Sequence, residues 1–275
     1  MENNNEALPG KYEMLAQKIR GMPKYRGVGV PEATVRSLVK QGLASGADIK
    51  TTEKAARMKL HNIIAPYLGD LDYEKAAADF MAVKDDPEQL AIFCFDGLER
   101  HASTRERGRD IAGMYAALFG KLGETRSIYD LACGLHPLGL PFTGLPRETI
   151  YRAYDLHGPR AAFLDIFIKG IGYAGGCFHR DIYAEPPAEP ADAAFFFKEA
   201  HRLEKREPGA TVRLIDGVPV KKFVASLPIS GMSGRRRLSG IYENMIVSYA
   251  DKNGFDMDTM EYGNEVFYII DKGNG

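Results

Sequence analysis

The chain lacks the sequence features of membrane, secreted and metal-clustering proteins. No apolar run approaches the roughly 20 residues that cross a bilayer, and the start, Met-Glu-Asn-Asn-Asn-Glu, has neither the basic nor the apolar region of a signal peptide. The three cysteines, Cys94, Cys133 and Cys177, are too few and too widely spaced for a disulfide framework or a cysteine metal site. There is no internal repeat and no low-complexity tract. These absences predict a cytoplasmic protein that spans no membrane and holds no metal.

What the chain does have is the composition of a large core and an uneven distribution of charge. Of its 275 residues, 45% are hydrophobic and 27% are charged, which suits one core, or one core with a smaller appended domain. Residues 1–60 carry eleven Lys and Arg against six Asp and Glu, although the net charge of the whole chain is −1. A basic end on an otherwise acidic chain favours a polyanionic partner. A solvated helical face explains the same charges, and charge alone does not separate the two interpretations.

Residues 1–100 are predicted to be entirely helical. Apolar residues recur there at helical spacing, and helix starts are marked by Pro31 and by Thr51 or Thr52 as a cap. The predicted helices span 11–21, a segment that opens at Pro31-Glu32, 53–68, 72–84 and 87–98.

The pattern changes near residue 125, where short β-rich runs begin to alternate with helical ones. The predicted helices here span 158–169 and 198–205, and the seven predicted strands span 127–132, 149–154, 176–180, 193–197, 222–227, 245–249 and 265–270. Such alternation predicts an α/β protein with a mostly parallel sheet covered by helices on both faces. A short connection between the last two strands predicts an antiparallel pair at the sheet edge.

Three successive strands end in residues that suit a nucleoside ligand. Ligands of open α/β sheets bind outside the carboxyl ends of the strands. Ala132-Cys133-Gly134 follows the first strand and lets a ligand approach the backbone closely. Asp155 follows the second and suits a ribose, and Asp181-Ile182 follows the third and suits an adenine. A single Asp at a strand end is usually a cap or turn residue, but three such sites on successive strands favour a ligand.

The loop after the first strand distinguishes between nucleoside cofactors. It lacks the Gly-x-Gly-x-x-Gly pattern, and Pro137 and Pro141 disfavour a helix directly behind the glycine. A pyrophosphate cradle needs that helix N-terminus. S-adenosylmethionine (SAM) has no phosphate, so the loop favours SAM over a dinucleotide.

The loop also resembles a known family. Asp-Leu-Ala-Cys-Gly-Leu-His-Pro-Leu, from Asp130, looks like the cofactor loop of the aminoglycoside-resistance 16S ribosomal RNA methyltransferases that modify N7 of guanine 1405. His-Ala-Ser-Thr-Arg-Glu-Arg, from His101, is similar to the signature His-x-Ser-x-x-Glu-Arg of that family. Shorter similarities lie at Lys59-Leu60-His61, Tyr67-Leu68, Leu227-Pro228-Ile229, Ser233-Gly234-Arg235 and Gly263-Asn264-Glu265. The resemblance spans nearly the whole chain.

The resemblance implies a SAM-dependent methyltransferase (Rossmann-like) fold with a seven-stranded sheet, and a set of cofactor-binding residues. Arg107 would pair with the methionine carboxylate, for which a forked guanidinium is well shaped. Asp155 would hold the ribose, and Phe197 would lie close to the sulfonium. The full implied set is His101, Ala102, Ser103, Arg107, Ala132, Gly134, Asp155, Asp181, Ile182 and Phe197. The segment 101–107 also fits an exposed, capped helix start, and both interpretations hold at once.

The chain departs from the family pattern at four positions. His136 stands where the family usually has Asn, and Ile64 lies near a common aromatic position. Ser230 replaces a frequent basic residue, which weakens one expected contact to RNA or to the target base. Arg206 replaces a Gln.

The resemblance further implies two domains with different functions. Residues 1–100 are expected to form a helical RNA-recognition domain and residues 101–275 the SAM-binding methyltransferase domain. Phosphate contacts are expected from basic residues of the first domain and from three consecutive arginines after the fifth predicted strand. The candidates are Lys11, Lys18, Arg20, Lys24, Arg26, Arg36, Lys40, Arg235, Arg236 and Arg237.

The implied reaction is methylation of N7 of guanine 1405 in 16S rRNA of the 30S subunit, which confers aminoglycoside resistance. Guanine N7 carries a free lone pair, so no catalytic acid or base is expected and the residues act by positioning. The target base would have to leave its stack. A monomer is expected, because the substrate is a large assembly. The alternatives are a 16S rRNA adenine-N1 methyltransferase, a SAM-binding RNA-binding relative without turnover, and a small-molecule methyltransferase, for which the basic domain would be surplus.

Overall fold

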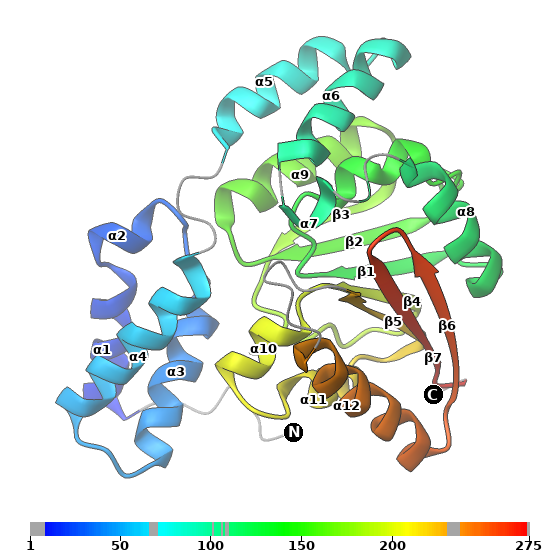
Figure 1. Ribbon diagram of the computed structural model, residues 1–275. Helices are drawn as coiled ribbons and strands as arrows, with labels where there is room; N and C mark the ends of the chain where they lie inside the picture. Colours follow the sequence, from blue (N-terminus) through cyan, green and yellow to red (C-terminus); the bar gives the residue numbers. More distant parts are fainter. Residues whose placement is uncertain are drawn as a thin grey trace.

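A seven-stranded sheet forms the centre of the computed structural model, which describes residues 9–65, 71–100, 102–105, 107, 110–229 and 237–273 (Figure 1). The strand order is β3-β2-β1-β4-β5-β7-β6. The strands are β1 (Ser127–Leu131), β2 (Ile150–Asp155), β3 (Ala174–His179), β4 (Ala191–Phe197), β5 (Val220–Pro228), β6 (Asp256–Tyr262) and β7 (Glu265–Asp271). β7 runs antiparallel to both of its neighbours, and β1 to β5 are parallel. The α/β class is thus confirmed. An antiparallel pair does lie at the sheet edge, but β6, rather than the predicted strand 245–249, pairs there with β7.

One predicted strand is wrong and one strand was missed. The segment 245–249 belongs to helix α12 (Arg237–Asn253). Its β-branched and aromatic residues suggested a strand, but the residues that α12 buries here, Ile246, Tyr249 and Ala250, follow helical spacing. The missed strand, β6, is rich in acids and largely exposed, so its sequence gives little sign of a strand. The strand that β6 pairs with is β7.

Helices cover both faces of the sheet, as the alternating pattern predicts. One apolar cluster joins one sheet face to α5 (Tyr73–Val83), α6 (Pro87–Arg100), α8 (Ile111–Leu122) and α9 (Gly158–Gly170). A second cluster joins the other face to α10 (Ala200–Arg206), α11 (Ala210–Gly217) and α12. Of these helices, α8, α11 and α12 had not been predicted. Within the described ranges no helix combines the length and the apolar character needed to cross a bilayer.

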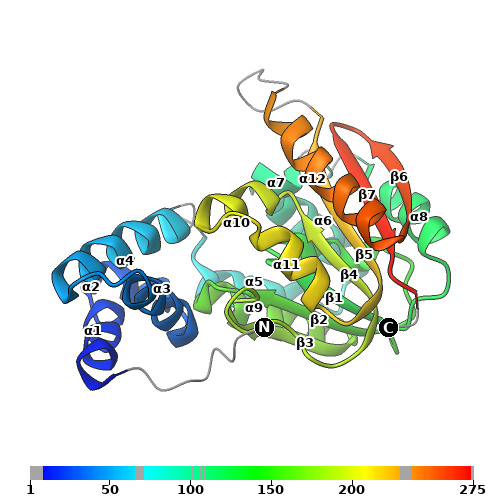
Figure 2. The ribbon, with the colours of Figure 1, turned by 90° about the horizontal axis from the view of Figure 1, so that it is seen from below.

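The first four helices form a unit with an apolar core of its own. This helical unit consists of α1 (Gly10–Arg20), α2 (Pro23–Arg26), α3 (Glu32–Ala44) and α4 (Ile49–Ile64). Helix α4 starts earlier than predicted, because Asp48, rather than Thr51 or Thr52, caps it by accepting a hydrogen bond from the Thr51 amide. Figures 1 and 2 both place the unit beside α10. By contrast, α5 and α6 pack on the sheet, so the helices of residues 1–100 belong to two packing units.

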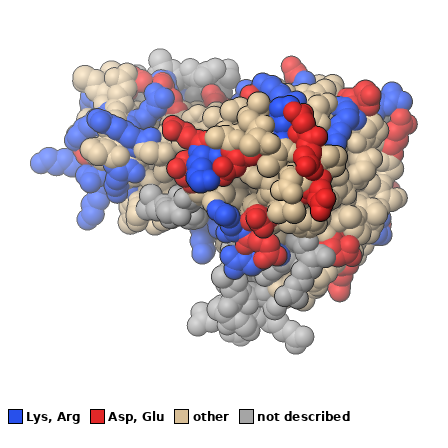
Figure 3. Space-filling view, turned by 90° about the horizontal axis from the view of Figure 1, so that it is seen from above, with Lys and Arg blue, Asp and Glu red and all other residues tan. Residues whose placement is uncertain are grey.

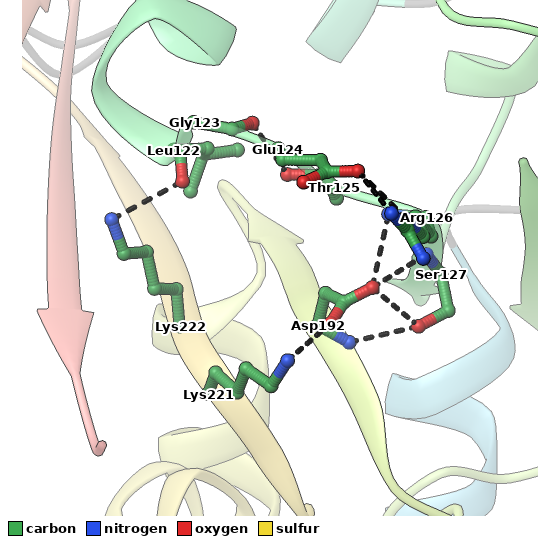
Figure 4. A network of polar contacts seen from close by, with 9 residues as sticks. All are labelled: Leu122, Gly123, Glu124, Thr125, Arg126, Ser127, Asp192, Lys221 and Lys222. Carbon is green, nitrogen blue, oxygen red and sulfur yellow. Dashed lines mark hydrogen bonds and ion pairs between the residues drawn. The ribbon is translucent and has the colours of Figure 1, made fainter. Parts of the chain in front are cut away.

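A polar network connects the amino ends of the central strands, at the end of the sheet opposite their carboxyl ends (Figure 4). The Asp192 carboxylate of β4 accepts hydrogen bonds from the amides of Arg126 and Ser127 and from the Ser127 hydroxyl. Lys221 of β5 donates to the other oxygen of Asp192 at 2.8 Å. These contacts hold β1, β4 and β5 in register, which fixes where their carboxyl ends lie.

Phe80 provides a test of the packing of α5 on the sheet domain. Its side chain is fully buried, and its ring centre lies 5.0 Å from that of Phe167 on α9. Phe80→Ala should lower the free energy of unfolding by about 3–5 kcal/mol. The adjacent Met81 is 52% exposed, so Met81→Ala should change it by at most about 0.5 kcal/mol. Denaturant unfolding measures both, and equal effects would contradict the packing.

Candidate functional site

The carboxyl ends of β1 and β4 hold the backbone in an uncommon conformation. Ala132, after β1, has φ 54°, and Lys198, after β4, has φ 59°; among the described residues these are the non-glycine residues with positive φ. Side-chain crowding makes this region costly for L-residues, and such residues cluster at ligand sites. The two strained positions lie at the sheet edge where the sequence predicts the ligand.

Two adjoining cavities open at this edge. The larger has a volume of about 500 Å³ and is lined by residues of the strand ends, of α10 and of α4, among them Ala132, Leu156, Asp181, Ile182, Phe196 and Arg206. The smaller is lined by Arg107, Gly134, Asp155, Arg160 and Phe197. Ala132, Glu199 and Arg202 line both cavities. The structure therefore brings seven of the predicted cofactor residues to one place.

The loop after β1 is held by a buried network centred on His136. Its Nδ1 lies 2.8 Å from the Asp130 carboxylate, and its Nε2 lies 2.7 Å from the Tyr115 hydroxyl. Tyr151 donates a hydrogen bond to the same Asp130 oxygen at 2.6 Å. His136 begins the 3-10 helix η3 (His136–Phe142), so no α-helix opens behind the glycine, as the prolines predict. The residue that departs from the family pattern thus supports the loop.

Arg107 forms a bidentate ion pair with the buried carboxylate of Glu265, at the start of β7. Its Nε lies 2.8 Å and its Nη2 2.5 Å from the two Glu265 oxygens. The Phe197 ring packs on the guanidinium, with its centre 4.7 Å from Arg107 Cζ. Lys198 and the Ser226 hydroxyl also contact Glu265. Burial would raise the pKa of Glu265, but Arg107 and Lys198 outweigh it and hold that pKa below its ordinary value. The sequence had suggested neither this pair nor a role for Glu265.

Asp155 ties the β1 loop to β2 and α9. Its carboxylate accepts hydrogen bonds from the amides of Gly134 at 3.1 Å and His157 at 2.7 Å. Arg160 of α9 donates to it at 3.1 Å and also donates to the Tyr73 hydroxyl of α5 at 2.7 Å. Both members of this ion pair are almost completely buried. No motif distinguishes Arg160 in the sequence.

Asp181 makes an ion pair with Arg206, the residue that replaces the family Gln. One carboxylate oxygen accepts from the amides of Tyr183 and Ala184 and from Arg206 Nη1 at 2.9 Å. The other oxygen lies 2.8 Å from the same Nη1 but receives no hydrogen bond. Arg206 also donates to Ser37 Oγ of α3, so the wall of the larger cavity is linked to the helical unit.

Glu199, directly after Lys198, was missed by the sequence analysis. It lines both cavities, and its side chain is 17% exposed. Burial raises the pKa of Glu199 to about 7, with Arg202 acting in the opposite direction. Nothing in the sequence distinguishes Glu199 from a surface glutamate, because its position depends on where β4 ends.

The surroundings of some residues singled out in the sequence are not given by the structure. His101, Ser230, Arg235 and Arg236 fall outside the described residues. Ala102 and Ser103 belong to α7 (Ala102–Arg105) and Arg237 begins α12, but the structure does not describe their side chains. Ile64 is buried in the core of the helical unit.

The predicted RNA-contacting cations differ in their surroundings. Three are held in ion pairs: Lys18 with Glu53, Arg20 with Glu32, and Arg36 with Glu13 and Glu32. Lys11 and Lys24 lie over tyrosine rings, Arg26 donates to the Gly21 carbonyl, and Lys40 is half-buried on α3.

A basic cavity on the helical unit includes cations that the prediction left out. It has a volume of about 450 Å³ and is lined by Lys24, Lys50, Glu53, Lys54, Arg57, Met58 and His61. Figure 3 shows Lys and Arg side chains gathered over this unit, at the left of the view. Five of the seven lining residues are basic, which suits an anion.

The strand order, the antiparallel β7, Asp155 at the end of β2 and Asp181 in the loop after β3 define the fold class as that of the SAM-dependent methyltransferases. Within this class, the sequence model described as ribosomal RNA methyltransferase (FmrO) matches residues 22–269. The chain belongs to that family, which confirms the resemblance seen in the sequence.

Curated relatives span nearly the whole chain. Proteins named 16S rRNA (guanine(1405)-N(7))-methyltransferase from Frankia casuarinae and Serratia marcescens are 29% and 28% identical to it, each covering 98% of this chain and 98% and 99% of the relative. The solved structure of the 16S rRNA methylase RmtB matches with a TM-score of 0.74 at 25% identity, covering 97% of this chain and all of that one. The structure of RmtF with S-adenosyl-L-homocysteine (SAH) has a TM-score of 0.71 at 24% identity, covering 96% and 99%.

The buried pair of Arg107 and Glu265 makes stability depend on pH. A lowered pKa in the folded state means that the Glu265 contribution is present above the unfolded pKa, about 4.3, and is lost as pH falls through the lower folded value. Glu265→Gln should lose about 3–5 kcal/mol at pH 7 and should show a shallower loss of stability in acid. Glu189→Gln is the control, since that side chain is 75% exposed. Urea unfolding from pH 7 to 3 measures both, and an unchanged acid slope in Glu265→Gln would refute this assignment.

Proposed function

We propose that this chain methylates N7 of guanine 1405 in 16S rRNA within the small ribosomal subunit, using SAM as the methyl donor. The observation that carries the proposal is the near full-length similarity to relatives with that name, which covers both the helical unit and the sheet. A relative that shared the cofactor fold alone would match only the second part. The enzyme is proposed to act as a monomer in the cytoplasm, where the assembled subunit is found.

The residues at the sheet edge fit SAM. A cavity of about 500 Å³ is within the usual range for a ligand of this size. Asp181 keeps a buried oxygen without a hydrogen bond, which suits the adenine amino group, and Ile182 offers an apolar wall. Asp155 accepts three hydrogen bonds and a carboxylate has about four acceptor positions, which leaves capacity for a ribose hydroxyl. His101, Ala102, Ser103, Ala132 and Gly134 stay assigned to the cofactor by the resemblance.

Arg107 is proposed to bind the methionine carboxylate with the N–H groups that do not face Glu265. The Glu265 pair then holds the guanidinium plane, and Phe197 covers its face. Bound SAM would supply an electrophilic methyl group. Guanine N7 needs no deprotonation, so the side chains of this chain act by holding and orienting the reactants and by excluding water.

The helical unit is proposed to recognise RNA, together with Arg235, Arg236 and Arg237. Its basic cavity offers closely spaced cations, and phosphate contacts of this kind fix the position of a protein on RNA without reading sequence. The domain division proposed here groups α1–α4 for RNA recognition and the rest of the chain for methyl transfer. The ion pair of Asp181 and Arg206, which reaches Ser37, joins the two parts.

Expression in a susceptible bacterium tests the target. Reverse transcription after chemical cleavage at N7-methylguanine should stop at guanine 1405, and the cells should resist 4,6-disubstituted deoxystreptamine aminoglycosides.

Asp181→Ala should weaken SAM binding about tenfold, as expected for one charge-assisted hydrogen bond. Asp79→Ala is the control, since the Asp79 side chain is 51% exposed on α5. A stop at an adenine would favour the adenine-N1 alternative, and SAM binding without any stop would favour a relative without turnover.

The basic cavity gives a separate prediction for RNA. Lys54→Ala with Arg57→Ala should weaken binding to purified small subunits about tenfold and make it less dependent on salt, because fewer phosphate contacts remain. SAM affinity should not change. Lys75→Ala is the control, a Lys that is 68% exposed on α5. Wild-type affinity of the double variant for the subunit would remove this cavity from the RNA surface.

A further inference from the structure

The carboxylates around the two cavities differ in how fully their charge is compensated. Asp130 is paired with His136 and Tyr151, and Asp155 with Arg160. Asp181 is paired with Arg206, and Glu265 with Arg107 and Lys198. Each of these partners is buried or nearly buried. These carboxylates are therefore occupied in holding the walls of the site.

Glu199 differs from the others. Its ion-pair partner is Arg202, at 2.8 Å, whose side chain is 41% exposed. Screening by water makes such a pair weak compensation for a charge that lies mostly inside the protein. Asp155 repels the charge, whereas Arg160 attracts it. The strained backbone of Lys198 brings Glu199 to the place where the two cavities adjoin, directly before Ala200, the first residue of α10.

We propose that Glu199 is a specificity-determining residue that favours the cationic methyl donor SAM over the neutral-sulfur product SAH. The proposal rests on SAM being the cofactor of this site. The two ligands carry the same adenine, ribose, amino and carboxylate groups, and they differ by one methyl group and one positive charge at sulfur. A carboxylate with weak compensation gains from that added charge, whereas a carboxylate already paired with a buried cation gains little.

The expected pH dependence of SAM binding follows from the ionisation of Glu199. A cation in the cavity favours ionised Glu199, so SAM binding lowers the pKa of Glu199 from about 7 and releases a proton when the solution is more acidic than that. SAM should therefore bind more tightly as pH rises through 7, whereas SAH should show much less change. The other charged or titratable groups lining the larger cavity are Lys59, Arg180, Asp181, Tyr183, His201, Arg202, Lys205 and Arg206. These groups meet both ligands alike. The variant Glu199→Gln therefore separates the effect of Glu199 on the relative affinities for SAM and SAH from the effect of the other groups.

Calorimetric titration of the full chain with SAM and with SAH at pH 5.5 and 7.5 tests the proposal. The ratio of the SAH Kd to the SAM Kd should rise about tenfold over this range in the wild type, which corresponds to a shift of about one pKa unit. In Glu199→Gln the ratio should be nearly constant, and SAM should bind about tenfold more weakly at pH 7.5 with SAH unaffected. Glu185→Gln, an exposed neighbour beyond β3, should behave as the wild type.

A constant ratio in the wild type, or a ratio that still rises in Glu199→Gln, would overturn the proposal. Glu199→Asp keeps an ionisable group and should retain the pH dependence, which covers the case that the Gln variant does not fold. If the folded wild type binds neither ligand, the proposed function itself fails. Binding of both ligands with a constant ratio removes only the role of Glu199.

Discussion

The buried carboxylate of Glu265 is the contact on which the arrangement of the site depends. It joins Arg107, in the segment before α8, to Lys198 at the end of β4 and to Ser226 of β5. Glu265 reaches these groups because β7 runs antiparallel beside β5, with Pro228 paired to Glu265 in the register. A buried charge with one partner removed is costly, so the four elements hold one another in place. Phe197 and the strained Lys198 take their positions from this group of contacts.

The fold and part of the site were accessible from sequence because they rest on local patterns. Alternating strand and helix signals predicted the parallel sheet, and the strand ends predicted Asp155 and Asp181. The pair of Arg107 and Glu265 joins residues 158 positions apart, and no local pattern reports such a contact. Arg160 and Glu199 gain their meaning only once α9 and α10 are packed beside the cavities. The error at 245–249 has the same origin, since packing of α12 overrides the β-propensity of its residues.

Two of the departures from the family pattern, His136 and Arg206, introduce polar contacts in the interior of the structure. His136 completes a network under the β1 loop, and Arg206 links Asp181 to Ser37 on the helical unit. Both residues make buried polar contacts and line the cavities at the strand ends. Buried polar networks restrict the geometry of the groups they connect. The Arg206 contact connects the proposed cofactor site to the helices proposed to bind RNA, whereas the partners of His136 lie on β1 and α8.

The most direct test of the proposed function is methyl transfer from labelled SAM to purified small ribosomal subunits, compared with naked 16S rRNA, with the modified base mapped. We expect one methyl group per subunit, at N7 of guanine 1405, and much slower transfer to naked RNA, because the helical unit is proposed to recognise the assembled subunit. Methylation at another base, or faster transfer to naked RNA than to subunits, would contradict it.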